Sequence, residues 1–269
     1  MPREPLASFG TEARELMKVC LAQSRSELGK LAGRDIGVAL RRGLREKQSL
    51  RMILAAAPSQ SEMLAALASE GDIDWHRVTA FHMDEYIDLP EDSPQRFGTW
   101  LQRSFFDHVP AAKFHLIKPG KDPEAACRAY ASILTEAPID LVLLGIGTNG
   151  HLAFNDPPAD LNDPLAVKVV KLDQMCREQQ VLDGCFATLD DVPKRAVTLT
   201  VPTLVAGREL FCCVPGRHKS AAVKAMMEAP ISGACPATAL RTHPRCTVYL
   251  DPESSSLSPL HEHSKDHRA

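Results

Sequence analysis

The sequence predicts an α/β fold: a single-domain, doubly wound, mostly parallel sheet flanked by helices in a Rossmann-like arrangement. Short apolar runs alternate along the chain with amphipathic stretches of helical spacing, and this alternation is typical of parallel sheets. A run that is apolar at every position, such as Leu141–Leu144, suits a strand covered on both faces. A chain of 269 residues with 44% hydrophobic residues can bury a large core.

The elements follow from these patterns in chain order. The apolar runs predict strands at Leu50–Ala57, Val78–Met83, Ile139–Ile146, Leu165–Leu172, Val197–Val201, Glu209–Val214 and Cys246–Leu250. Apolar positions at helical spacing predict one helix that begins after Ser24 or Ser26 and ends at Lys47, and others at Ser61–Ser69, Phe97–His108, Pro123–Glu136, Lys219–Glu228 and Ala234–Arg241.

This alternation occupies residues 25–252, which we expect to form the one functional domain. Residues 1–24 are expected to form a helical N-terminal extension, because apolar residues such as Met17 and Leu21 recur at helical spacing. Residues 253–269 begin with a run of serines and are expected to form a disordered tail.

Composition excludes several classes of partner. The formal net charge of -3 gives no broad attraction to nucleic acid, so no nucleic-acid partner is expected. No apolar run approaches the roughly 20 residues of a membrane helix, and no apolar signal core follows the N-terminus. The eight cysteines are scattered without a Cys-x-x-Cys pair, which favours buried thiols in a reducing compartment. We therefore expect a cytoplasmic protein without a membrane partner.

Ligands of open α/β sheets bind beyond the carboxyl ends of the strands, so the residues after each apolar run are the candidates. Asp84 and Glu85 directly follow the run that ends at Met83. A carboxylate that is partly removed from water there has a raised pKa and can act as a general base. An isolated Asp-Glu pair would suit a purely structural role, with the aspartate capping a turn and the glutamate in a surface ion pair. The neighbouring segments are what favour a catalytic role.

A glycine-rich segment follows the next predicted strand. Gly145, Gly147 and Gly150 allow tight turns, and their backbone N–H groups could face an oxyanion or a sugar oxygen. The spacing matches a dinucleotide fingerprint, but the asparagine and prolines that follow are a poor helix start. Histidine is the side chain suited to moving protons near neutral pH, so His151 is a candidate for this role, and Asp156 can orient its ring. The alternative is a buried histidine that bonds only to the backbone.

Two further loops could bind an anion. Lys219 stands at the start of a predicted helix after a turn at Gly216, where free N–H groups and the helix dipole favour phosphate. A cation opposes that dipole, so a bound anion explains Lys219 better than a solvated turn does. Ser59, Gln60 and Ser61 follow the first predicted strand and either cap the next helix or bind phosphate.

A metal site is a weaker interpretation of the same residues. His82, Asp84, His151 and Asp156 could together ligate a metal, but their spacing matches no zinc motif. We therefore expect no metal.

In the order and spacing of these motifs the chain resembles the glucosamine-6-phosphate deaminase/6-phosphogluconolactonase superfamily. The matching segments are Phe81–Tyr86 with Leu89-Pro90, Gly145–Pro157, Gly216–Lys219 before a helix, Phe105–His108 and Asp191–Lys194. Lactonases typically continue the Gly-His pair with Thr-Ala-Ser-Leu-Phe-Pro. Leu152–Pro157 stands there in this chain, so the resemblance is to the deaminase branch.

The resemblance implies a deaminase that converts glucosamine 6-phosphate into fructose 6-phosphate and ammonia without a metal or another cofactor. His151 would open the sugar ring, and Asp84 would move the C2 proton to C1 through an enolamine. Asp156 would orient His151, and Asn149 would orient a sugar hydroxyl. The residues expected to contact the sugar phosphate are Ser59, Gln60, Ser61, Glu85, Gly147, Gly150, Arg177 and Lys219.

The chain departs from the family pattern mainly where phosphate would bind. Ala56–Ser61 replaces a glycine-rich Thr-Gly-Gly-Thr/Ser-Pro loop, and Gln180 stands where some relatives have a phosphate-binding arginine. Arg177, three residues earlier on an expected helix, is a candidate substitute. Asn149 stands where some relatives have aspartate, and Asp156 stands where glutamate is usual.

Two other functions stay open at this stage. A lactone hydrolase would use His151 to activate water, which leaves Asp84 without an obvious task. A non-catalytic sugar-phosphate sensor would explain the altered phosphate loop. The sequence does not choose among hexose and hexosamine phosphates, and it leaves a homo-oligomer and an allosteric effector open.

Overall fold

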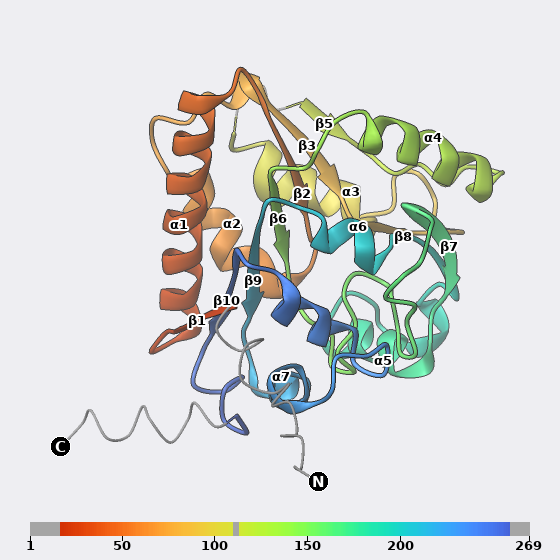
Figure 1. Ribbon diagram of the computed structural model, residues 1–269. Helices are drawn as coiled ribbons and strands as arrows, with labels where there is room; N and C mark the ends of the chain where they lie inside the picture. Colours follow the sequence, from red (N-terminus) through yellow and green to blue (C-terminus); the bar gives the residue numbers. More distant parts are fainter. Residues whose placement is uncertain (1–16, 110–112, 259–269) are drawn as a thin grey trace, which may run out of the picture.

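Seven parallel strands form the centre of the molecule (Figure 1). The computed structural model describes residues 17–109 and 113–258. Across the sheet the strands lie in the order β1 (Lys18–Leu21), β10 (Cys246–Leu250), β9 (Glu209–Val214), β6 (Leu141–Leu144), β2 (Leu50–Leu54), β3 (Val78–His82) and β5 (Lys113–His115). Every pairing between these neighbours is parallel, which confirms the predicted fold class.

The order of the strands reverses between β2 and β6. From β2 the chain builds outward through β3 to β5, then returns to the other side of β2 with β6 and continues through β9 to β10. The carboxyl ends of β2, β3 and β6 are nearly level, since Leu54 pairs with both His82 and Leu143; β9 continues past Cys212, the partner of Leu144, to Val214. Such a reversal is where doubly wound sheets bind their ligands.

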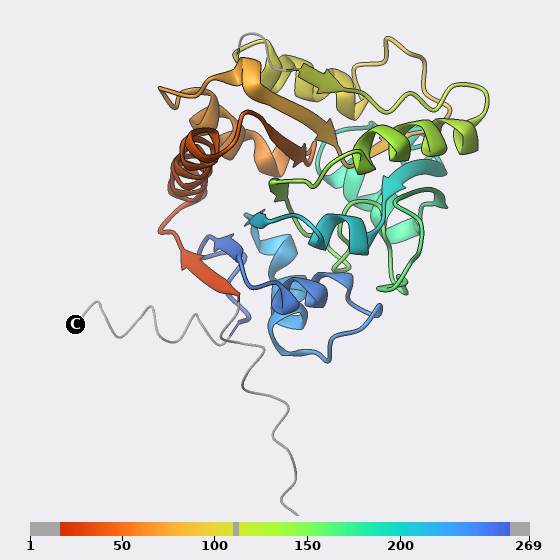
Figure 2. The same cartoon turned by 45° about the horizontal axis from the view of Figure 1, so that its top comes forward.

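Helices cover both faces of the sheet. On one face, α1 (Arg25–Glu46), α2 (Ser61–Ala68) and α3 (Phe97–Leu101) share one apolar cluster with Met52 and Leu54 of β2. On the other, α4 (Pro123–Thr135), α6 (Val201–Val205) and α7 (Ser220–Glu228) share a second cluster with Ile53. Figures 1 and 2 show the resulting layers. Successive strand residues point to opposite faces, so continuously apolar strands are what this architecture needs.

A second sheet of three antiparallel strands lies beside the first. It contains β4 (Asp84–Tyr86), β8 (Arg195–Leu199) and β7 (Val167–Lys171), in the order β4-β8-β7. The runs over 165–172 and 197–201 therefore do not extend the parallel sheet as predicted. Val201 belongs to α6 instead, because Pro202 suits the first turn of a helix and cannot donate to a strand ladder.

Several other boundaries differ from the predictions. Residues 97–108 are not one uniform helix, because α3 changes into a π-helical segment at Gln102–Phe106. The segment after Cys235 is a 3₁₀ helix, Pro236–Thr242. Helix α5 (Gln174–Leu182) was not given bounds by the sequence patterns, and it proves central to the site. No helix in the described ranges is long and apolar enough to cross a membrane.

The predictions for both ends of the chain need correction. Lys18–Leu21 is the edge strand β1, paired with β10, and not part of a helical extension; residues 1–16 lie outside the described residues. Pairing with β10 determines that this segment is a strand, because four residues are too few to show a hydrophobic period in the sequence. Residues 253–258 form turns in which Ser254 and Ser255 are buried and bonded to Asp251, so the predicted disorder is wrong there. Residues 259–269 lie outside the described residues.

Helices α1 and α2 approach closely because glycines line the contact. An added Cβ at Gly29 would lie 2.4 Å from the Cβ of Glu62. At Gly33 it would lie 2.6 Å from the Cβ of Ala66 and 2.8 Å from the Leu67 nitrogen. Backbone atoms cannot move aside as a flexible side chain can, so a larger residue must separate the two helices.

We expect Gly33→Ala to lower the free energy of unfolding by about 1–2 kcal/mol, since overpacking outweighs the gain in helix propensity. Urea denaturation followed by circular dichroism measures the change. Gly71→Ala is the matched control, because nothing lies within 4 Å of a Cβ added there. A Gly33→Ala protein as stable as the control would show that the helices can separate freely.

Candidate active site

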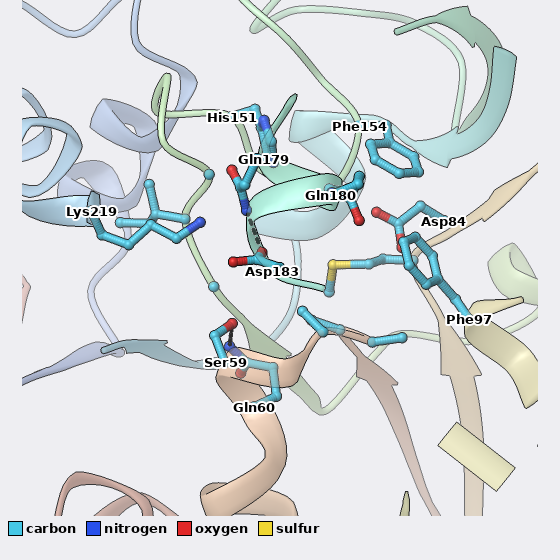
Figure 3. Close-up of a pocket in the computed structure, with 18 residues that line it drawn as sticks. Ser59, Gln60, Asp84, Phe97, His151, Phe154, Gln179, Gln180, Asp183 and Lys219 are labelled. Atoms are coloured by element: carbon cyan, nitrogen blue, oxygen red, sulfur yellow. Dashed lines mark hydrogen bonds between the residues drawn. The ribbon is translucent and has the colours of Figure 1, made fainter. Parts of the chain in front are cut away.

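A cavity of about 520 Å³, partly open to solvent, lies at the carboxyl ends of β2, β3, β6 and β9 (Figure 3). It occupies the reversal point of the sheet, where doubly wound folds bind their ligands. Its polar lining side chains are Ser59, Gln60, Asp84, His151, Gln179, Gln180, Asp183 and Lys219. Five of the residues predicted to form the site line this pocket with their side chains: Ser59, Gln60, Asp84, His151 and Lys219. They come from segments far apart in the sequence.

Asp84 lies in the pocket wall where the chain passes from β3 to β4. Its backbone is held by antiparallel pairing with Thr198 of β8, so the side chain is supported by a sheet. Burial raises the pKa of the Asp84 carboxyl well above its usual range, and the neighbouring Glu85 charge raises it further. A carboxylate with a raised pKa is a stronger base, which is what proton abstraction from carbon needs.

Glu85 does not line this pocket, because successive residues of a strand point to opposite sides. Its buried carboxylate accepts hydrogen bonds from the backbone N–H groups of Tyr86, Phe97 and Gly98, at 3.0–3.1 Å. Burial raises the Glu85 pKa, and these bonds together with Arg96 oppose the rise. Glu85 therefore fixes the start of α3, whose Phe97 lines the pocket, and is not placed to contact a substrate there.

His151 pairs with Asp156. The His151 Nδ1 atom lies 3.1 Å from Asp156 Oδ1, and the Asn149 side-chain amide donates to the same oxygen at 3.0 Å. Within the described residues Nε2 makes no hydrogen bond, so it is the atom available to a ligand. Gly147 leaves room for the ring, since an added Cβ would lie 2.2 Å from it.

Asp156 stays ionised beneath the histidine. Burial opposes its charge, but hydrogen bonds from His151, Asn149 and the Asp173 backbone outweigh burial and lower the Asp156 pKa. A carboxylate in this position stabilises a protonated imidazole. Asn149 and Asp156 are absent from the pocket lining, and both are hydrogen-bonded to His151.

Lys219 supplies a cation to the pocket. Gly216, with φ of 95°, turns the chain after β9, and a 3₁₀ turn at Arg217–Lys219 leads into α7. The Lys219 side chain is almost fully buried, and burial lowers its pKa to about 8 against the opposing effect of Asp183. A buried ammonium near neutrality is well suited to an anionic ligand.

The turn after β2 provides the opposite wall. The Gln60 amide donates to Ser59 Oγ and to the Cys213 carbonyl, each at 3.1 Å. Ser61 is the first residue of α2 and does not line the pocket, and Gly150 is absent from the lining too. Gly150 has φ of 83° and its carbonyl accepts from Ala237, so it shapes the loop instead.

Helix α5 contributes polar groups that the sequence patterns missed. The Gln179 carbonyl oxygen accepts from the Thr148 backbone, and its amide donates to Asp183 at 3.2 Å. The Gln180 carbonyl oxygen accepts from the Tyr86 hydroxyl at 2.8 Å. Gln179 and Gln180 lie three and four residues after the buried Cys176, a spacing that could have indicated the inward face.

Arg177 does not reach the pocket, which corrects its predicted role as a substitute for arginine at position 180. Its guanidinium donates to the backbone carbonyls of Leu189 and Val192 on the outer side of α5. The side chains of two residues three apart on a helix can still point to different surroundings, one toward the core and the other toward a neighbouring loop.

The structure brings together one set of metal-type donors among the residues it describes, His151, Asp156 and Cys176. Hydrogen bonds already occupy both Asp156 oxygens, and burial raises the Cys176 pKa far above that of a thiolate ligand. His82 does not join this set, because its Nε2 accepts from the Ile117 backbone and burial lowers its pKa to about 3.

A buried carboxylate, a histidine–carboxylate pair and a lysine at the reversal point of a parallel sheet define an enzyme-like acid–base site for a small anionic molecule. The profile of the glucosamine-6-phosphate isomerases/6-phosphogluconolactonase family matches residues 23–249. The chain belongs to this family.

Individual relatives agree. The chain is 32% identical over 214 residues to glucosamine-6-phosphate deaminases of Bacillus thuringiensis (strain Al Hakam) and Bacillus cereus (strain AH820), covering 79% of each chain. A solved monomeric glucosamine-6-phosphate deaminase is 29% identical and superposes with a TM-score of 0.82, over 90% of this chain and 100% of that one. The 6-phosphogluconolactonase of Thermotoga maritima, 20% identical, has a TM-score of 0.71 over 87% and 99% of the two chains and shares the fold.

We expect Lys219→Met to stabilise the protein at pH 7 by about 1–3 kcal/mol, because it removes a buried charge. The pKa of Lys219, about 8, is below the ordinary 10.5. The cost of burying the charge is therefore full below pH 8 and fades between pH 8 and 10.5, as the folded amine loses its proton first. Urea denaturation at pH 7 and pH 10 measures this.

Lys224→Met is the matched control, since Lys224 is exposed on α7, the helix that Lys219 precedes. Its stability should change by less than about 0.5 kcal/mol at both pH values. Equal effects of the two substitutions would show that the Lys219 ammonium is well solvated.

Proposed function

We propose that this protein deaminates a hexosamine 6-phosphate, converting glucosamine 6-phosphate into fructose 6-phosphate and ammonia. The placement of Asp84 carries the proposal: a buried carboxylate with a raised pKa faces a pocket that also holds His151 and Lys219. The names of the Bacillus relatives and of the monomeric deaminase support the same reaction. We place the reaction in the cytoplasm as part of this proposal, because the eight cysteines are free thiols.

The residues divide the steps between them. His151, oriented by Asp156, moves a proton at the ring oxygen through Nε2 and opens the sugar. Asp84 then takes the proton from C2 and returns it to C1, by way of an enolamine, which leaves an imine at C2. Water adds to that imine and ammonia departs, which gives the ketose. The phosphate end of the sugar lies toward Lys219 and the turn at Ser59–Gln60.

Lactone hydrolysis is the lesser interpretation. Its support is the fold shared with 6-phosphogluconolactonases of 16–20% identity, and likeness at that level concerns architecture. A hydrolase needs an activated water at a carbonyl group, and it has no step for a buried Asp84 base.

Asp84→Asn should reduce proton exchange at C2 of glucosamine 6-phosphate and its turnover by at least about 1,000-fold, because the amide cannot accept the proton. Binding should survive, since the amide has nearly the same shape. Proton NMR in deuterated buffer follows exchange at C2, ketose formation and ammonium release in one sample.

Asp92→Asn, in the exposed loop before α3, is the control and should retain full turnover. Full turnover by Asp84→Asn would mean that another group is the base. Hydrolysis of 6-phosphogluconolactone by the unmutated protein, without C2 exchange on glucosamine 6-phosphate, would favour the lactonase.

The dependence of kcat/KM on pH should be bell-shaped. Activity falls as pH decreases through the raised pKa of Asp84, because the carboxyl becomes protonated and stops acting as a base. It falls again as pH increases through about 8, because Lys219 loses the charge that attracts the phosphate. Lys219→Met should abolish the alkaline limb and keep the acidic one. An alkaline limb that persists in Lys219→Met would assign it to another group.

A further inference from the structure

The phosphate end of the pocket is not strongly cationic. Lys219 is the one lysine or arginine among the described residues that line it. Asp183 lines the same end and interacts with the Lys219 charge. In Figure 3, Asp183 lies between Lys219 and the turn at Ser59 and Gln60. One carboxylate thus balances one ammonium, which leaves little net charge to bind a dianion.

Asp183 is held in this position by its neighbours. It accepts a hydrogen bond from the Gln179 amide at 3.2 Å, and His218 Nε2 lies 3.7 Å from its other oxygen. Its side chain is 15% exposed. Burial and the adjacent Lys219 charge lower the pKa of His218, so the imidazole adds little positive charge near neutrality.

Gln60 lines the same end of the pocket and adds no charge to it. Its side chain is fully buried, and its amide donates to Ser59 Oγ and to the Cys213 carbonyl. Its Oε1 atom is buried without a hydrogen-bond partner among the residues described, so it is not presented to a ligand in this conformation. Lys219 and Asp183 therefore set the charge at this end of the pocket.

A second cavity lies beside Asp183. It shares Ala56, Ala57, Phe97 and Asp183 with the first, and Pro94 and Trp100 are part of its remaining wall. A substituent at this end of the sugar therefore does not have to stop at Lys219.

We propose that this protein accepts hexosamines whose distal substituent is a hydroxyl or a single negative charge as well as the 6-phosphate, and that Asp183 sets this preference. The proposal rests on the deamination proposed above for its reaction. It extends the substrates to hexosamines without a phosphate dianion, which a pocket with several arginine and lysine side chains would bind poorly.

The decisive measurement is the binding of two unreactive probes, 2-amino-2-deoxyglucitol and its 6-phosphate. In both, C1 is an alcohol instead of an aldehyde, so neither can be deaminated and their binding does not depend on catalysis. Isothermal titration at pH 7, where Lys219 is mostly charged, gives the ratio of their dissociation constants. We expect the phosphate to improve binding by less than about 30-fold, because the net charge facing it is small.

Asp183→Asn tests the assigned residue. The amide can still accept from Gln179 but carries no charge, so the preference for the phosphorylated probe should rise at least about five-fold. Asp190→Asn is the matched control, because Asp190 is exposed in the turn after α5 and lines no part of the pocket. It should leave the ratio unchanged.

A ratio above about 30 in the unmutated protein, or a smaller rise in Asp183→Asn, would overturn the proposal. Turnover separates this inference from the proposed function. Deamination of glucosamine 6-phosphate with a high binding ratio would retain the function and reject the inference. A low ratio without deamination of either glucosamine or its 6-phosphate would retain the charge preference and reject the function.

Discussion

The parallel pairing of β9, β6, β2 and β3 is the constraint on which the site depends. Because their registers align Leu54 with His82 and Leu143, the loops that follow β2, β3 and β6 leave the sheet at nearly one level. The reversal between β2 and β6 separates those loops and leaves a cavity that backbone does not fill. Each reactive side chain inherits its position from a strand end and not from a flexible segment.

Burial then gives these side chains their chemistry. The same removal from water raises the pKa of Asp84 and lowers that of Lys219, so each charge is held against its preferred hydration. Such groups oppose folding and persist because the surrounding sheet and helices position them firmly. Asp156 shows the contrast, since three hydrogen bonds outweigh burial and keep it ionised beneath His151. A base that can be protonated and a carboxylate that stays charged are thus made from one residue type.

The residues of the site fall into two groups, the acid–base residues and the residues at the end of the pocket that faces Lys219. The acid–base candidates Asp84 and His151 lie in the motifs that match the family, whereas the end facing Lys219 presents the neutral Gln180, where some relatives have an arginine, and the acidic Asp183. In the proposed reaction, proton transfer depends on Asp84 and His151, whereas the proposed selectivity depends on the groups that face the distal substituent. The two properties can therefore change separately in evolution.

The sequence by itself determined the alternation of strands and helices, five of the seven strands of the parallel sheet (β2, β3, β6, β9 and β10), and the loops that carry Asp84, His151 and Lys219. Those follow from local period, apolar content and chain order. Tertiary structure decided the rest. Pairing partners made β7 and β8 a separate antiparallel sheet and Lys18–Leu21 a strand. The alternation of side chains turned Glu85 away from the pocket, and the docking of α5 aimed Gln180 and Asp183 inward and Arg177 outward, because such directions depend on contacts between residues distant in sequence.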